Sequence, residues 1–317
     1  MKVLQVTSTS SFEVLDLPVP EPGPGQVLMR VEAISTCPQW DLHLRHNEPM
    51  FVGHQFHYPY TPGQPGHEGV GTIEGLGPGV EGPAVGTRVC AWRDQGHDRQ
   101  GCYAQFVVME AGNVIAVPED LPAAALAPLE LAMCVGTVFR MLKEMDVIAG
   151  RSFGVSGLGP AGLVAMQMAR AEGATKVVGF DPVTERRQFA LGMGADRCLD
   201  PTADCSADLP ERLQTSVDCH GAKASVESTM DRTSDVVALF GVQREDYTYA
   251  LRHGGIRLCG YKGHFLESAQ YALDLIVAGK LNLAPLCTHT LPLERYGEGI
   301  DLLEQRKALK VLYRPWE

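Results

Sequence analysis

The chain lacks any Cys-x-x-Cys pair, although it contains nine cysteines. The cysteines are scattered and odd in number, so they are expected to be reduced thiols rather than a disulfide framework. No apolar run approaches the length of a membrane span, and the N-terminus turns polar within a few residues. These absences predict a soluble protein of the cytoplasm, with no signal peptide and no membrane partner.

The chain also has fewer basic than acidic residues. Lysine and arginine total 27 against 38 acidic residues, which makes the formal net charge −11 and the isoelectric point about 5.4. This balance argues against nucleic acid or an anionic membrane surface as a partner. The length of 317 residues is about twice that of a typical domain, so two hydrophobic cores are expected.

The most specific motif lies near the middle of the chain, where a strand-like run meets a glycine fingerprint. The fingerprint reads Gly157, Leu158, Gly159, Pro160, Ala161 and Gly162. The first glycine permits a tight turn, the second lets the backbone approach a pyrophosphate, and the third lets the new helix pack on its strand. Asp181 follows about 20 residues later, where a carboxylate accepts the ribose hydroxyls of NAD. This order predicts a dinucleotide-binding unit with phosphate at the helix N-terminus.

Two arginines leave the choice of coenzyme open at first. Arg186 and Arg187 follow Asp181 closely and could hold the 2′-phosphate of NADP. Asp181 would repel that phosphate, so NAD is expected, with Arg186 packed against the adenine.

The rest of the chain divides into two kinds of pattern. Before residue 120, short strand-like runs at 2–7, 12–17 and 27–34 alternate with glycine- and proline-rich turns, which predicts a β-rich barrel or sandwich. Helices are then expected at 123–131 and 135–145. Further along we expect helices at 184–191, 269–278 and 296–305, and strands at 235–240, 256–260, 287–293 and 310–312. This alternation is typical of a parallel sheet.

The β-rich half also carries residue types that bind Zn²⁺. Cys37, the adjacent pair His67 and Glu68, and Glu130 supply a thiolate, an imidazole and carboxylates. Three protein ligands would leave the fourth zinc position open to substrate or water. Each residue has a plainer interpretation, such as a buried thiol or a solvated turn. Cys134, one helical turn after Glu130, is a rival ligand.

This order of motifs resembles the zinc-containing medium-chain dehydrogenases/reductases, the group of alcohol, sorbitol and threonine dehydrogenases. The resemblance covers nearly the whole chain. It implies an α/β protein with a β-rich GroES-like catalytic domain over residues 1–125, completed by 272–317. It also implies a Rossmann coenzyme domain, a doubly wound parallel sheet, over 126–271.

The resemblance further implies a reaction and its residues. The reaction is hydride transfer between a secondary alcohol or polyol, or the corresponding ketone, and NAD. Cys37 and His67 would bind the zinc, Glu130 would be the third ligand as in the polyol branch, and Glu68 would bind the ion transiently. The family implies a dimer or tetramer, joined through the edge strand near 255–260.

The chain departs from the family at a second metal site. Members with a structural zinc carry four closely spaced cysteines, whereas this chain has only Cys90 and Cys102 in the corresponding stretch. We therefore expect one catalytic zinc and no structural zinc.

The chain also departs from the family along the proton path. Three residues rather than two separate Cys37 from Asp41, and Gln39 stands where a hydroxyl usually relays the proton. The candidates for the relay are then His43, His46 and Ser35. Asp41 is expected to orient His67 by a hydrogen bond.

Two alternatives remain beside a zinc-dependent dehydrogenase. One is a zinc-free quinone or enone reductase on the same scaffold, which would not need the cysteine and His-Glu ligands. The other is an NAD-binding module without turnover, favoured by Gln39 and by the altered spacing after Cys37.

Overall fold

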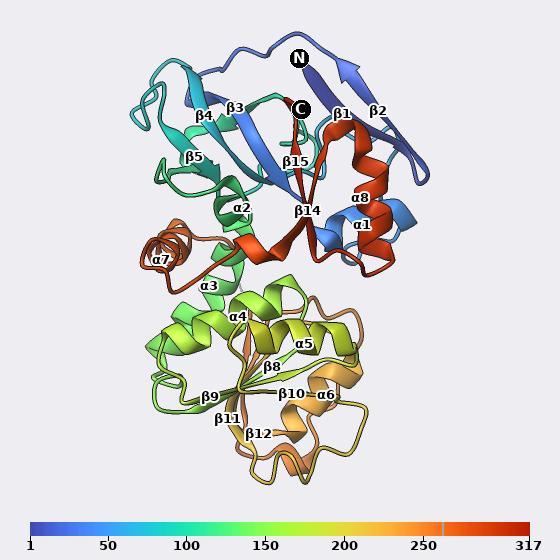
Figure 1. Ribbon diagram of the computed structural model, residues 1–317, viewed down its shortest axis with the longest axis vertical. Coiled ribbons are helices and arrows are strands. Elements are labelled where there is room, and N and C mark those ends of the chain that lie inside the picture. The colour runs from blue at the N-terminus through green and yellow to red at the C-terminus, as the bar shows by residue number, and fades with distance from the viewer. Residues whose placement is uncertain (262) are drawn as a thin grey trace. The chain divides into compact units, whose positions relative to one another are not determined.

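The structure is a computed structural model that describes residues 1–261 and 263–317 (Figure 1). The chain forms two compact units, of which the first comprises Met1–Leu131 and Asn282–Glu317 and the second Ala132–Leu281. The boundaries predicted from the sequence lie at 125/126 and 271/272.

The first unit is built on a seven-stranded sheet. Its strands are β3 (Gln26–Ser35), β4 (Glu68–Leu76), β5 (Arg88–Ala91), β6 (Phe106–Glu110), β7 (Val114–Ala116), β14 (Cys287–Pro292) and β15 (Lys310–Arg314). The order is β14-β15-β3-β4-β5-β7, and β6 also pairs with β3. Only the β14–β15 pairing is parallel. The last strand of the chain therefore pairs with an early one, with Leu312 opposite Ser35 (Figure 1).

The other elements of the first unit surround this sheet. They are the antiparallel hairpin β1 (Lys2–Ser8) and β2 (Ser11–Asp16), the helices α1 (Pro38–His46), α2 (Ala123–Leu126) and α8 (Tyr296–Glu304), and the 3-10 turns η1 (Ala111–Asn113), η3 (Ala284–Leu286) and η4 (Leu293–Arg295). Burial alternates along β3, where Val27, Met29 and Val31 are buried and enter the core of this unit.

Helix α1 was not predicted from the sequence. Its polar sequence shows little apolar periodicity, which is the main signal for a helix. Its ends do carry helix signals, because Pro38 occupies the first turn and Asn47 caps the C-terminus in the left-handed conformation, with φ 54°.

Helix α3 (Leu129–Glu144) follows α2 after a break at Pro128. The two predicted helices were placed with their break after residue 131, so that boundary is wrong. By length and composition alone, the stretch Ala123–Glu144 could cross a membrane, contrary to the expectation that no run is long enough. Inside the structure 78% of its most apolar window is buried, and a buried core helix passes the same test.

The second unit contains a six-stranded parallel sheet. Its strands are β8 (Ser152–Ser156), β9 (Lys176–Phe180), β10 (Arg197–Leu199), β11 (Leu213–Asp218), β12 (Thr233–Leu239) and β13 (Arg257–Gly260), in the order β10-β9-β8-β11-β12-β13. Its other elements are α4 (Pro160–Ala171), α5 (Thr184–Gly192), α6 (Lys223–Asp231), α7 (Leu266–Val277) and the 3-10 turn η2 (Leu251–His253).

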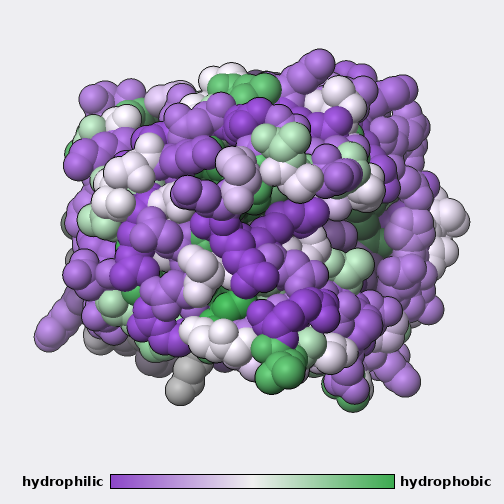
Figure 2. All heavy atoms as spheres, turned by 90° about the horizontal axis from the view of Figure 1, so that it is seen from below, coloured by the Kyte–Doolittle hydropathy of each residue, from purple (hydrophilic) through white to green (hydrophobic). Residues whose placement is uncertain are grey.

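This strand order is that of a Rossmann sheet, in which ligands bind at the point where the order reverses. Here that point lies between β8 and β11. The predicted β-rich unit and the predicted doubly wound parallel sheet are confirmed. One face of the molecule, shown in Figure 2, is mostly hydrophilic, with hydrophobic side chains in small groups.

Candidate metal centre and coenzyme site

The pairing of β3 with β4 brings the candidate metal ligands together. Ser35 at the end of β3 lies opposite Glu68 at the start of β4. Cys37 follows Ser35 by two residues and His67 directly precedes Glu68, so both side chains leave the same end of the strand pair. Cys37, His67 and Glu68 each offer one ligand atom, and these atoms all lie within 4.8 Å of one another.

Glycine permits the backbone turn that presents His67. A Cβ atom at Gly66 would lie 2.7 Å from the amide nitrogen of Tyr103 and 2.9 Å from the carbonyl oxygen of Gly63. These are backbone atoms, so a larger residue would displace the chain just before the histidine.

The imidazole of His67 is oriented for metal binding. Its Nδ1 lies 2.8 Å from the carbonyl oxygen of Pro65, which can only accept, so Nδ1 carries the proton and Nε2 is the metal-binding atom. Nε2 lies 3.8 Å from Oε2 of Glu130, in the first turn of α3. The predicted Glu130 is therefore close to the group formed by Cys37, His67 and Glu68.

Glu68 is held by a buried network that the sequence-based interpretation did not include. Lys310 donates hydrogen bonds to both carboxylate oxygens of Glu68, at 2.7 and 2.6 Å, and another to the carbonyl of Thr36. Ser35 donates a further bond to Glu68 at 2.5 Å. Lys310 is fully buried and Glu68 is only 1% exposed. Glu68 is thus a member of the ligand group whose two oxygens both accept hydrogen bonds from a lysine.

The electrostatics of the cluster favour a bound cation. Burial disfavours charge on His67, yet the Cys37 hydrogen bond and the charges of Cys37, Glu130 and Glu68 raise its pKa well above its usual range. The surroundings therefore stabilise positive charge at the imidazole. Thiolate, imidazole and carboxylate are the donors that Zn²⁺ prefers, so the residues present fit this ion.

Asp41 does not orient His67, so that prediction is wrong. Its carboxylate accepts hydrogen bonds from Tyr103, at 3.0 and 3.1 Å, and from Tyr296, at 2.9 Å. The additional residue after Cys37 rotates Asp41 by about 100° around α1, because each residue turns an α-helix by that angle. Burial raises the pKa of Asp41 from 3.8 to about 6, although both tyrosine bonds and nearby positive charge oppose the rise.

The proton-relay candidates lie in different surroundings. His43 is in α1, and its Nδ1 donates to the carbonyl of Glu48 at 3.0 Å. The Nε2 of His46 lies 3.1 Å from Oε1 of Glu304, with both side chains more than 40% exposed. Ser35 belongs to the Glu68 network described above. The relay role of His43 stays a prediction.

Cys134, the rival to Glu130, lies one helical turn further along α3. Its sulfur accepts a hydrogen bond from the hydroxyl of Tyr261 at 3.2 Å. Glu130 belongs to the first unit, where its Oε2 lies 3.8 Å from Nε2 of His67, whereas Cys134 belongs to the second unit.

The glycine fingerprint forms a tight turn from β8 into α4. Gly157 has φ +84°, a conformation that side chains rarely adopt, and a Cβ at Gly162 would lie 1.8 Å from the carbonyl oxygen of Gly157. Gly159 caps α4, a Cβ there would meet nothing within 4 Å, and Pro160 occupies the first helical position. The amides of Ala161 and Gly162 lie in the first turn of α4 and have no partner within the helix. This cradle fits a phosphate.

Asp181 is positioned against the same turn. Its Oδ2 accepts the backbone amide of Leu158 and its Oδ1 accepts that of Val183, both at 2.9 Å. An ionised carboxylate has acceptor capacity beyond two bonds, so ribose hydroxyls can still be accepted. Arg186 lies 3.7 Å from Asp181 with its side chain 34% exposed.

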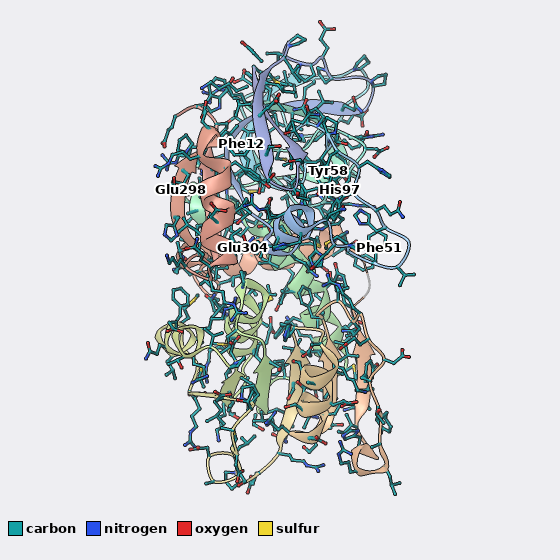
Figure 3. The ribbon with its side chains drawn as sticks, turned by 90° about the vertical axis from the view of Figure 1, so that its right-hand side faces the viewer. Phe12, Phe51, Tyr58, His97, Glu298 and Glu304 are labelled. Carbon is teal, nitrogen blue, oxygen red and sulfur yellow. The ribbon has the colours of Figure 1, made fainter. Side chains whose placement is uncertain are left out.

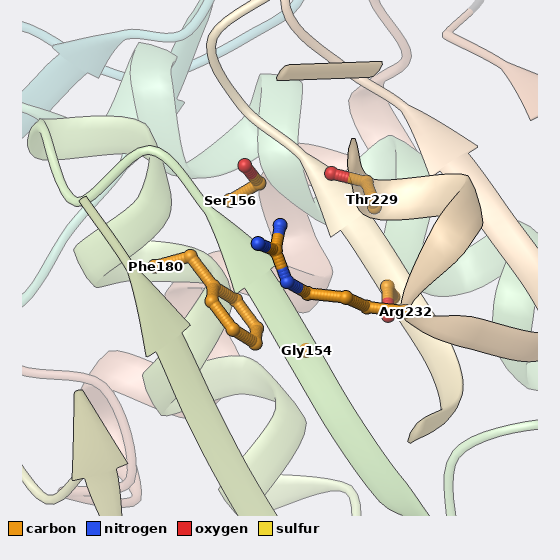
Figure 4. Close-up of a pocket in the computed structure, with 6 residues that line it drawn as sticks. Gly154, Ser156, Phe180, Thr229 and Arg232 are labelled. Atoms are coloured by element: carbon orange, nitrogen blue, oxygen red, sulfur yellow. The ribbon is translucent and has the colours of Figure 1, made fainter. Parts of the chain in front are cut away.

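A separate hollow lies in the second unit under α6. It is lined by Gly154, Ser156, Phe180, Ser216, Thr229 and Arg232. The guanidinium of Arg232 reaches across it, 5.2 Å from the ring centre of Phe180, and donates to the carbonyl of Pro201 at 3.0 Å (Figure 4). The fingerprint turn leads instead into α4, so the coenzyme cradle and this hollow are different features.

Sequence reasoning missed Lys310 as part of the site. The sequence did contain one indication, which is a lysine at the start of the largely apolar strand Lys310–Arg314. A charged residue in such a position is typical of a buried ion pair. Its partner could not be named, because nothing local connects it to Glu68, which lies 242 positions earlier in the chain.

Comparisons with known families agree with this arrangement. The profile of the alcohol dehydrogenase GroES-like domain matches residues 23–119, and the zinc-binding dehydrogenase profile matches residues 160–250. The first match lies in the first unit and the second in the second unit.

Known proteins are similar to this chain over nearly its whole length. L-threonine 3-dehydrogenase of Pyrococcus abyssi is 29% identical over 352 residues, covering 98% of this chain and 97% of the relative. The structure of 2R,3R-butanediol dehydrogenase from Bacillus subtilis superposes with a TM-score of 0.86 at 20% identity, covering 99% of both chains. That of galactitol-1-phosphate dehydrogenase from Escherichia coli has a TM-score of 0.85 at 20% identity, covering 99% of this chain and all of that one. At this identity the two structures establish the fold.

Proposed function

The chain belongs to the zinc-type medium-chain dehydrogenase/reductase family, and we propose that it transfers hydride between a secondary alcohol or polyol and NAD. The observation that carries this proposal is the cluster of Cys37, His67 and Glu68 donor atoms within 4.8 Å. A zinc-free reductase would have no need of a thiolate, an imidazole and a carboxylate at one buried point. The relatives named above are dehydrogenases of hydroxyl compounds, which supports the same reaction class.

Cys37, His67 and Glu130 would hold a single catalytic zinc. Bound there, the ion supplies Lewis acidity toward the oxygen of the substrate. Pro65 keeps His67 in the tautomer that presents Nε2, and Lys310 donates hydrogen bonds to both carboxylate oxygens of Glu68. Glu68 would bind the ion transiently, when the substrate oxygen or water leaves.

No structural zinc is proposed. Cys90 and Cys102 are both fully or almost fully buried, and burial raises the pKa of both thiols, that of Cys102 to about 12. Neutral thiols in a core are poor metal ligands, because the thiolate is the species that binds.

NAD is the proposed coenzyme, and it would supply the hydride acceptor for the oxidation. The turn from Gly157 to Gly162 would bind its pyrophosphate through the first-turn amides of α4. Asp181 would accept the adenosine ribose hydroxyls, and its negative charge disfavours the 2′-phosphate of NADP. Arg186 would pack against the adenine.

The remaining predictions about partners belong to the same proposal. The protein is proposed to act on a small molecule in the cytoplasm, without nucleic acid or membrane. A dimer or tetramer through β13, the edge strand of the parallel sheet, follows from the family alone.

Metal analysis and a substrate panel together test the proposal. We expect about one zinc per chain and NADH formation with secondary alcohols or polyols, with NADP clearly poorer. Zinc below a tenth of an equivalent in an active protein would favour the quinone or enone reductase. Zinc and NAD bound without turnover across a broad panel would favour the non-catalytic module.

A further inference from the structure

The loop 92–105 joins β5 to β6, in the stretch where family members with a structural zinc carry four cysteines. Here the loop contains one cysteine, Cys102, which is buried. Side-chain amides bind the backbone of this region. Gln64 and Gln95 each donate two hydrogen bonds to backbone carbonyls and Gln100 donates one, and these carbonyls belong to the loop and to β6. Neutral amides therefore cross-link the loop.

Gln64 connects this loop to the turn that carries the candidate ligand His67. Its side chain is buried, and its Nε2 donates to the carbonyls of Gly96, at 3.0 Å, and Arg99, at 2.9 Å. The next residue, Pro65, supplies the carbonyl that accepts the hydrogen bond from Nδ1 of His67 at 2.8 Å. The Gln64 amide thus joins the loop to the segment that orients the imidazole.

Backbone contacts reinforce the same connection. The amide of Cys102 donates to the carbonyl of Gly66 at 2.7 Å, and that of Gly101 donates to the carbonyl of Pro62 at 3.0 Å. A Cβ atom at Gly63 would lie 2.2 Å from the carbonyl oxygen of Gly101, so the two backbones are in direct contact. The turn that carries the histidine is therefore packed against the end of the loop.

The loop also contacts the segment that carries Cys37. The imidazole of His97 stacks on the indole of Trp40, with ring centres 3.8 Å apart and 24° between the ring planes. Trp40 lies in the first turn of α1, the helix whose N-cap is Cys37. Figure 3 marks His97 in the first unit. The loop 92–105 therefore contacts two of the segments that supply metal ligands, one through Gln64 and the other through His97.

These two segments need support from outside the strand pair. The last residues that β3 and β4 pair at this end are Ser35 and Glu68. Cys37 and His67 both lie beyond that pair, so the hydrogen bonds between β3 and β4 do not fix their separation. A binding site functions when its groups are held to within about 0.5 Å of the required geometry.

We propose that Gln64 and His97 are positioning residues for the metal centre. Through them the loop 92–105 fixes the segments that carry His67 and Cys37 relative to each other. The inference rests on the proposed function, because it assigns these residues a part in zinc binding at that site. Residues that orient metal ligands typically contribute about 10- to 100-fold to the affinity for the metal.

The rate of zinc release from the zinc-loaded, full-length protein tests this role. Gln64→Met keeps a side chain of similar length and removes both hydrogen-bond donors. We expect it to accelerate the transfer of zinc to an excess of a coloured chelator about tenfold, because the imidazole is then less firmly oriented.

Gln105→Met is the matched control in the same unit. The Nε2 of Gln105 donates to the carbonyl of Pro315 at 3.0 Å, and its Oε1 accepts from the amide of Lys2 at 2.9 Å. This variant also loses two hydrogen bonds, but neither of them involves a segment that carries a metal ligand. Its zinc should leave at a rate within about twofold of the wild type.

The visible spectrum of the Co²⁺-loaded protein distinguishes positioning from general stability, because cobalt bands depend on the geometry of the ligands. At full cobalt occupancy, Gln64→Met should change the positions or intensities of these bands, whereas Gln105→Met should give the wild-type spectrum. His97→Ala removes the stack on Trp40, so it should also accelerate zinc release and change the spectrum. It replaces Gln64→Met if that variant fails to fold.

The outcomes separate this inference from the proposed function. A wild-type release rate and cobalt spectrum in Gln64→Met or in His97→Ala would overturn the role of that residue and leave the dehydrogenase function intact. Equal acceleration by Gln105→Met and Gln64→Met would overturn it too, because the cause would then be general destabilisation. A wild type that binds less than a tenth of an equivalent of zinc would overturn the zinc-dependent function, and the positioning role with it.

Discussion

Replacing Lys310 by methionine would remove the cation that neutralises Glu68 inside the first unit. Methionine has a similar length and no charge, so the cavity stays filled while the ion pair is lost. Glu68 would keep the bond from Ser35 but would lie, almost completely buried, close to the charge of Glu130.

The expected loss is large because neither partner reaches solvent. Lys310 is 0% and Glu68 1% exposed, and the two form bonds of 2.7 and 2.6 Å. Removing one member of a buried pair costs about 3–5 kcal/mol, since the other charge is left uncompensated. The double variant Lys310→Met with Glu68→Gln should recover a large part of this loss, because no buried charge remains.

Tryptophan fluorescence during urea unfolding of the metal-free protein measures this loss directly. The three tryptophans are Trp40, Trp92 and Trp316, and all lie in the first unit, so the signal follows the unit that contains the pair. Lys2→Met is the matched control, because Lys2 pairs with Glu294 on the surface of the same unit, with both side chains over 40% exposed.

The control should lose less than about 1 kcal/mol, as exposed ion pairs do. If Lys310→Met lowered the free energy of unfolding no more than Lys2→Met does, the buried pair would not stabilise this unit. That result would refute the prediction. A double variant as unstable as Lys310→Met alone would also contradict it, because the loss would then come from packing and not from the orphaned carboxylate.

Three other changes have expected results. Cys37→Ser should reduce bound zinc from about one equivalent to below a tenth, measured by elemental analysis, because it removes the thiolate ligand; unchanged zinc would contradict the assigned ligand set. Asp181→Asn should lower the kcat/KM preference for NAD over NADP at least tenfold, because it removes the charge that repels the 2′-phosphate; an unchanged ratio would assign the preference to other residues. Asp41, with its pKa raised to about 6, binds its proton more tightly when folded, so the wild type should lose stability as pH rises from 4 to 6. Asp41→Asn cannot ionise and should gain about 3 kcal/mol relative to wild type across that range in urea unfolding; parallel pH profiles would show that the buried carboxyl does not titrate in this way.

Most of the coenzyme unit could be predicted from the sequence, because the motifs that indicate it are formed by neighbouring residues. Gly157 needs a positive φ and Gly162 must approach the preceding turn, and only glycine meets both demands. Asp181 then follows at the end of the next strand. The spacing alone therefore indicated a turn, a helix N-terminus and an acidic residue at one point of a parallel sheet.

Only part of the metal cluster could be predicted from the sequence. The residue types at Cys37, His67 and Glu130 indicated zinc, but their meeting depends on the pairing of β3 with β4 and on the start of α3. Helix α1 was missed, and with it the direction of Asp41, which bonds two tyrosines instead of the predicted histidine. One additional residue in a helix turns every later side chain by about 100°.

By itself, the sequence determined the features that a few neighbouring residues dictate: the glycine turn, the acidic residue after it, the donor types for a metal and the two-unit α/β architecture. Only the tertiary structure decided the contacts between distant segments: Lys310 on Glu68, the tyrosines on Asp41, and Gln64 on the loop 92–105. The physical reason is that such contacts depend on strand pairing and on loop packing. Neither strand pairing nor loop packing can be recognised from the residues that flank each partner in the sequence.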